Sequence, residues 1–183
     1  LRTWGEPHET IADAMHVWRD PAAKTMVAMG MSPNRVTLVP TPYQTFADIL
    51  GLQGELLGLE SYDWLSEATS PTAPHVAGAT RLPGDNPTYL LPFTTERANP
   101  IMLSILMTGG KASAIHLNFL NPNDGASEIE LREVVAQALA SKARANRFVL
   151  SADGNEIQTP SRMYTLSVVQ GSVWLVVAKR QYQ

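Results

Sequence analysis

Two histidines and an aspartate near the N-terminus are the first side chains that could act together chemically. His8, Asp13 and His16 fall within Pro7–Trp18, a segment with helical spacing of apolar residues. Imidazole and carboxylate groups bind zinc and similar cations, and residues three apart on a helix can touch. A further ligand at a recognisable spacing is missing. The segment therefore predicts a solvated helix face and no bound metal.

Serine and lysine side chains offer a second chemistry, that of a Ser–Lys protease. Ser104 or Ser113 could supply the nucleophile. Lys111 or Lys142 could supply the base, although no spacing singles out one pair. A Ser-His-Asp triad also stays open, because its members can lie anywhere in a chain, but no Gly-x-Ser-x-Gly elbow begins one. A small α+β enzyme, for example a hydrolase or Ser–Lys protease, or a ligand-binding domain is therefore the alternative interpretation.

Other catalytic and cofactor chemistries find little support in the sequence. Glu128, Glu130 and Glu133 lie at an expected helix start, where the helix dipole explains acidic residues without catalysis. The chain has no Cys, so disulfides, thiolate nucleophiles and Cys-based zinc sites are excluded. No glycine-rich phosphate loop follows a strand. We therefore predict no catalytic residue, no metal and no organic cofactor.

Composition points to a folded domain with little surface charge. The 183 residues are 44% hydrophobic and 17% charged, against roughly 25% charged in an ordinary soluble domain. The length predicts a single domain over residues 1–183. A net charge of −3 argues against a strong nucleic-acid-binding surface, and no apolar run approaches the ~20 residues of a membrane span. Neutral surfaces are typical of protein interfaces, so we expect homo- or hetero-oligomeric partners.

The N-terminal half predicts short elements joined by turns. Residues 1–22 are expected to form a helical arm, because Ile11, Met15 and Trp18 recur at i, i+4 and i+7. A strand is expected over Arg35–Pro40, and a helix capped by Thr45 after it. Residues 66–88 are rich in Pro, Gly, Ser and Thr and predict a long loop.

The middle of the chain contains the clearest periodicities. Asn99-Pro100 predicts a helix start for the apolar run Ile101–Met107, with a buried strand as the rival. Ala112–Phe119 alternates as a strand, and it places His116 on a polar face expected to be exposed. Ser127–Ala145 predicts a helix. Its expected buried residues are Leu131, Val134, Val135, Ala138 and Leu139.

The last part, residues 147–183, predicts antiparallel hairpins. Val173–Ala178 is apolar on both faces, so one face must be covered by the Ser127–Ala145 helix or by another subunit. If that helix packs elsewhere, Trp174 becomes a candidate interface anchor. The pattern as a whole predicts a β-rich fold with helices, for which we suspect a jelly-roll-type β-sandwich. The alternative is an α+β single domain with a C-terminal antiparallel sheet.

Three stretches resemble capsid proteins of picorna-like viruses, of the dicistrovirus, iflavirus and marnavirus kind. They are Gly5–Arg19, which is similar to the helical entry of those proteins, Val36–Pro40, a strand ending in Pro, and Asn99–Gly110 with Lys111–Phe119, a helix, glycine and strand. The resemblance implies an eight-stranded jelly roll, release from a polyprotein and an icosahedral shell, without catalytic residues.

A structural assembly protein is accordingly the first expectation, and a viral capsid subunit released from a polyprotein is its narrower form. The start of the sequence, without Met or an apolar leader, is typical of a processed or trimmed end. The expected location is the virion for a capsid protein, and otherwise the soluble cytoplasm.

Overall fold

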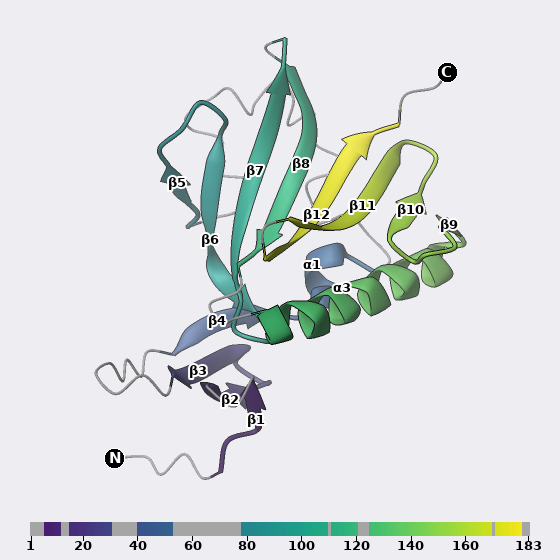
Figure 1. Ribbon diagram of the computed structural model, residues 1–183. Helices are drawn as coiled ribbons and strands as arrows, with labels where there is room; N and C mark the ends of the chain where they lie inside the picture. The colour runs from purple at the N-terminus through teal and green to yellow at the C-terminus, as the bar shows by residue number, and fades with distance from the viewer. Residues whose placement is uncertain are drawn as a thin grey trace.

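One large sheet accounts for most of the described chain. The computed structural model describes residues 6–11, 15–30, 40–52, 78–109, 111–120, 125–169 and 171–180. Figure 1 shows the curved sheet with helices α1 (Phe46–Leu50) and α3 (Gly125–Asn146) beneath it. The expectation of a β-rich fold with helices is confirmed. Neither described helix has the length and apolarity that crossing a membrane requires.

The twelve strands of the described residues pair in an order that follows the chain closely at both ends. The spatial order is β1-β2-β3-β4-β6-β7-β8-β12-β11-β10-β9, with β5 beside β6. All pairs are antiparallel except β4 with β6. The strands are β1 (Glu9–Ile11), β2 (Met15–Asp20), β3 (Thr25–Gly30), β4 (Thr41–Gln44), β5 (Thr80–Leu82), β6 (Thr88–Thr95), β7 (Pro100–Thr108), β8 (Lys111–Phe119), β9 (Val149–Leu150), β10 (Glu156–Gln158), β11 (Arg162–Val169) and β12 (Ser172–Lys179). The described residues thus form one sheet with helices on one side, and the suspected jelly-roll sandwich is not confirmed.

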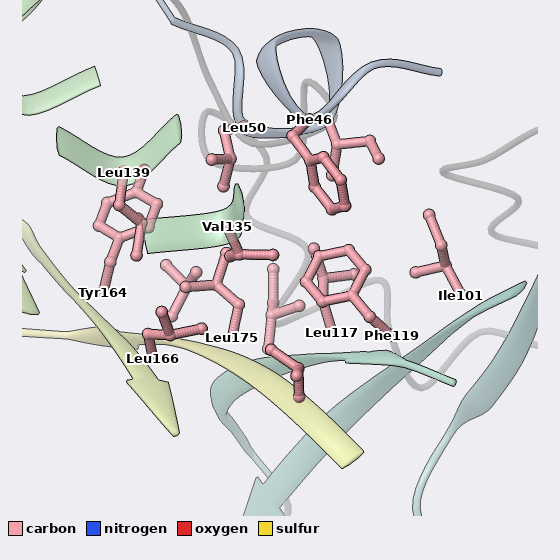
Figure 2. Packing of buried hydrophobic residues seen from close by; sticks show 14 of the residues in the cluster. Phe46, Leu50, Ile101, Leu117, Phe119, Val135, Leu139, Tyr164, Leu166 and Leu175 are labelled. Carbon is pink, nitrogen blue, oxygen red and sulfur yellow. The ribbon is translucent and has the colours of Figure 1, made fainter. Parts of the chain in front are cut away.

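Helix α3 lies across the inner face of the sheet, as the helical period over Ser127–Ala145 predicts. Leu131, Val135 and Leu139 are buried, which confirms three of the five expected core residues. The other two, Val134 and Ala138, are partly buried and pack against the same core. Figure 2 shows Val135 and Leu139 directed at side chains from the strands and from α1. Inner-face residues contributed by the central strands are Ile101, Leu103, Ile105, Ile115, Leu117, Phe119, Tyr164, Leu166, Val173, Leu175 and Val177.

The expected N-terminal helical arm is wrong, because residues 15–20 form a strand. β2 and β3 make a hairpin in which Val17 and Met26 are buried. Asp20 turns the chain between them: its Oδ1 accepts the backbone N–H groups of Ala22 and Ala23. Short apolar runs fit either period, and here pairing with β3 outweighs the helical spacing.

Two further sequence expectations are corrected. Ile101–Met107 belongs to strand β7, the rival interpretation, because the segment pairs with β6 and β8 and alternates between buried and exposed residues. In the expected long loop, Thr80–Leu82 forms strand β5 against β6, while residues 66–77 lie outside the described residues. The expected strand at Arg35–Pro40 also lies outside them, except for Pro40.

The remaining strand predictions are confirmed. Ala112–Phe119 lies in β8. The predicted hairpins within residues 147–180 are β9 with β10 and β11 with β12. β12 also pairs with β8, so it is a central strand of the sheet.

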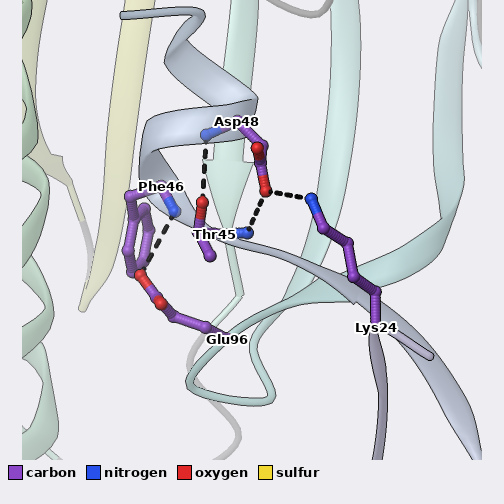
Figure 3. Close-up of polar contacts among 5 residues, drawn as sticks. All are labelled: Lys24, Thr45, Phe46, Asp48 and Glu96. Atoms are coloured by element: carbon purple, nitrogen blue, oxygen red, sulfur yellow. Dashed lines mark hydrogen bonds and ion pairs between the residues drawn. The ribbon is translucent and has the colours of Figure 1, made fainter. Parts of the chain in front are cut away.

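A network of polar contacts fixes α1 to the N-terminal hairpin (Figure 3). Thr45 caps the helix: its Oγ1 accepts the Asp48 N–H, and Asp48 Oδ2 accepts the Thr45 N–H. The same Asp48 oxygen forms an ion pair with Lys24 Nζ at 2.9 Å, and this hydrogen bond lowers the pKa of Asp48. Glu96 Oε1 accepts the Phe46 N–H from the opposite side. The first turn of α1 is thereby held by two separate segments.

Shortening the inner core residues of α3 is expected to weaken the fold. Leu131→Ala or Leu139→Ala should lower the free energy of unfolding by about 2–5 kcal/mol, because each leaves a cavity against the sheet. Urea denaturation followed by circular dichroism measures the loss. Ile129→Ala is the matched control, since Ile129 is 64% exposed on the same helix and should change stability by no more than about 0.5 kcal/mol. Equal effects at Ile129 and Leu131 would contradict the packing.

Candidate interaction surface

The side of strands β6, β7, β8, β12 and β11 that points away from α1 and α3 is called here the outer face. Successive residues of a strand point to opposite sides, so the residues between the buried ones belong to it. It consists of Thr88 and Leu90 on β6, Met102, Ser104 and Leu106 on β7, Ala114, His116 and Asn118 on β8, Trp174, Val176 and Ala178 on β12, and Met163, Thr165 and Ser167 on β11.

At these positions the outer face carries no Asp, Glu, Lys or Arg side chain, and the nearest charged residue on the same side of the neighbouring strand β10 is Glu156, the cross-strand partner of Thr165. An antiparallel sheet that faces water on one side usually alternates apolar residues with polar ones, but here the second side is also half apolar. Most of its residues are partly exposed; Leu90 and Leu106 are 37% and 38% exposed, whereas Leu117 and Leu175 on the inner face are 0% exposed. Both helices of the described part pack on the inner face. Exposed apolar patches of this kind mark protein contacts.

Trp174 and His116 form the centre of the outer face. Their rings meet edge to face, with centroids 5.9 Å apart. This packing half buries His116, which corrects the expectation that it is exposed, and the burial lowers the pKa of the His116 imidazole. The sequence predicts Trp174 as an interface anchor on the condition that α3 does not cover its side of the sheet. This condition is met, because α3 packs on the opposite side.

One buried hydrogen-bond donor and one buried acceptor lie at this centre without a partner among the described residues. Trp174 Nε1 and Asn118 Oδ1 are buried and, within the described residues, make no hydrogen bond. The two residues are direct cross-strand partners on β12 and β8. An unpaired buried polar atom costs about 1–3 kcal/mol, so such a pair is a site where a binding partner could recover free energy.

Lys142, one of the two lysines considered for a Ser–Lys pair, is bound elsewhere and is not paired with either candidate serine. Lys142 is 1% exposed on the inner side, where its Nζ donates to the carbonyl oxygens of Leu50 and Gly51 at 2.8 and 2.9 Å. These carbonyls end α1, so Lys142 caps that helix and ties it to α3. Ser104 lies on the outer face, with its hydroxyl 3.1 Å from Thr88 Oγ1.

The other two candidates for that chemistry lie at the β7–β8 hairpin. Ser113 Oγ is 3.0 Å from Thr108 Oγ1 and donates to the Leu106 carbonyl. Lys111 begins β8, and its backbone pairs with Thr108. The hydroxyl of Ser113 is therefore used to close the hairpin.

The two described candidates for metal ligation do not share a helix, because His16 lies in β2 and His8 immediately precedes β1. His8 Nδ1 accepts the Arg19 N–H at 3.0 Å, and His16 Nδ1 is 3.0 Å from Thr10 Oγ1. Asp13 lies outside the described residues. The described part of the chain holds no group of three or more His, Cys, Asp or Glu residues placed to bind a metal.

The acidic residues at the start of α3 lie toward solvent. Glu130 and Glu133 are exposed, and Glu130 Oε2 accepts a hydrogen bond from Arg97 Nη2 at 2.8 Å. These positions agree with a role in stabilising the start of the helix through its dipole.

Sequence analysis placed Trp174 on the right side of its strand but missed its neighbours. The alternation in Ala112–Phe119 does put His116 and Asn118 on the side away from the core. Placing them beside Trp174 also requires knowing that Val173–Ala178 pairs with this strand. That pairing joins strands separated by α3 and three further strands, so no local signal indicates it.

Removing the Lys142 cap is expected to destabilise the protein. Lys142→Met keeps most of the apolar stem but deprives the Leu50 and Gly51 carbonyls of their donor, which should cost about 1–3 kcal/mol. Arg144→Met, an exposed change on the same helix, is the control. Thermal unfolding of both variants compares them, and an unchanged stability of Lys142→Met would exclude the capping role.

The free energy of unfolding should decrease as the pH is lowered through the range in which His116 takes up a proton. Because burial lowers its folded-state pKa below the ordinary 6.5, the unfolded chain binds this proton first. The free energy of unfolding is therefore unaffected by His116 well above pH 6.5 and decreases as the pH falls below it. Urea titrations from pH 8 to 5.5 should show a smaller decrease in His116→Gln than in wild type. His8→Gln controls for loss of a histidine elsewhere, and an unchanged slope in His116→Gln would contradict the assignment.

Comparison with known proteins yields no relative from which a function can be transferred. No family model matches the chain, no curated protein matches it, and no solved structure matches it. Its function is therefore inferred from the outer face and from the residues around it.

Proposed function

We propose that this chain is a structural assembly protein whose outer face binds another protein subunit. The observation that carries the proposal is the uncharged, half-apolar outer face, which neither described helix covers. Burying apolar surface contributes about 25 cal/mol per Å², so a face of this composition gains free energy when a partner covers it. Trp174 lies at its centre, and buried Trp is enriched among residues that dominate binding energy.

The chemistry of this face favours a protein partner over other classes. Nucleic acid and anionic membranes are bound through Lys and Arg side chains, and the outer face has none. An enzyme of the hydrolase class is the alternative. Ser104 and His116 are cross-strand partners on the outer face, but the Ser104 hydroxyl is hydrogen-bonded with Thr88. An assembly role makes use of more of the face than this single pair does.

A viral capsid subunit is the narrower form of the proposal. It is supported by the resemblance of Lys111–Phe119, which is a strand as expected, and by the uncharged outer face. Gly5–Arg19 and Asn99–Gly110 support it less, because the helices that the resemblance implies there are replaced by strands β1 and β2 and by strand β7. In this form the chain would contact copies of itself or related subunits within a shell.

The association state of the purified protein tests the proposal. Size-exclusion chromatography with light scattering should give a mass well above 20.0 kDa for wild type. Trp174→Ala should shift the mass toward 20.0 kDa while circular dichroism stays that of wild type, because Trp174 is on the outer face and only partly buried. Ile129→Ala, on the far side of the molecule, should keep the wild-type mass. A wild-type monomer at every concentration would refute the assembly role.

A further inference from the structure

We infer that the partner of the outer face is a second copy of this chain, bound so that the two outer faces meet about a two-fold axis. The inference rests on the proposed assembly function and names its partner. Two sheets that meet in this way pack about 10 Å apart, as in a β-sandwich, with the side chains of the two faces between them. The centre of the contact would be Trp174, His116, Asn118 and Val176, on the adjacent strands β8 and β12.

Charge supports a self-complementary contact. In a two-fold contact a side chain near the axis meets its own copy, so any charged residue there would meet a like charge. Of the described Lys, Arg, Asp and Glu residues, none lies at the outer-face positions of β6, β7, β8, β12 and β11; Glu156 on β10 points to the same side, but it lies beyond β11, away from the centre of the face. A face that binds a different partner through opposite charge would instead be enriched in charged residues of one sign. The outer face therefore suits a copy of itself.

Hydrogen bonding supports the same geometry. The Trp174 indole can only donate through Nε1, and Asn118 Oδ1 can only accept. A two-fold axis between these neighbours places each copy's donor opposite the other copy's acceptor, so one operation satisfies all four atoms. Both atoms are covered in the single chain, so the two side chains must turn outward to form these bonds. The Trp174 side chain is already partly exposed at the centre of the face.

Opposite charges placed at Val176 test the two-fold contact directly. Val176 is partly exposed beside His116, so a charged side chain can reach solvent in the single chain. Val176→Glu and Val176→Lys should each lower the association constant at least tenfold, because each variant opposes its own charge. An equimolar mixture should recover dimers of twice 20.0 kDa that contain one chain of each kind. Light scattering and native mass spectrometry measure the masses.

The control variants separate folding from association. Ile129→Glu makes the same kind of change at an exposed apolar residue of α3 and should keep the wild-type mass. Circular dichroism checks that each variant is folded. If Val176→Glu fails to fold, Thr165→Glu and Thr165→Lys replace the pair, because Thr165 is the partner of Val176 on β11 and is also partly exposed.

Each outcome decides between the two proposals. Recovery of association only in the mixture supports the two-fold contact. If wild type associates and both Val176 variants keep its mass, the inference is overturned, while assembly through another surface survives. If both variants lose association and the mixture stays dissociated, the outer face binds a different surface and the two-fold geometry is overturned. A monomeric wild type overturns the assembly function itself.

Discussion

The packing of α3 on one side of the sheet is the contact on which the other features depend. β12 carries apolar residues on both faces, and α3 with α1 can cover only one of them. Leu131, Val135 and Leu139 meet the inner face and complete its core. The position of α3 thereby assigns every other residue of five neighbouring strands to the outer face. The candidate interface is therefore the face of the sheet that α3 leaves uncovered, and no separate sequence motif marks it.

The buried ammonium group of Lys142 joins the two helices, because it extends from α3 and binds the carbonyl end of α1. α1 is only five residues long, too short to be stable alone, and it is held at both ends by side chains from distant segments. Asp48 and Lys24 fix its start, and Lys142 from α3 satisfies carbonyls at its end. A lysine that looks like a catalytic base in the sequence is thus placed by the fold as a structural cap.

Local patterns were sufficient where an element is decided by its own residues. The period of Ser127–Ala145, the cap at Thr45 and the turns of the C-terminal hairpins all predicted structure correctly. Errors arose where distant pairing decides, as at Pro7–Trp18 and Ile101–Met107, whose apolar spacing fits helix and strand alike. The outer face was only half predictable for the same reason: Trp174 was identified, but its neighbours come from a strand that precedes α3.

The central place of β12 has a consequence for how the molecule is made. β12 lies between β8 and β11, yet the chain reaches it only after α3 and three further strands. Pairing it with β8 closes a long loop, which is entropically costly and slows folding. Until then the hydrogen-bonding edge of β8 is open, and an open edge can pair with another chain. During synthesis on the ribosome, a nascent chain would expose this edge until the residues of β12 emerge, and that interval is when a chaperone would matter most.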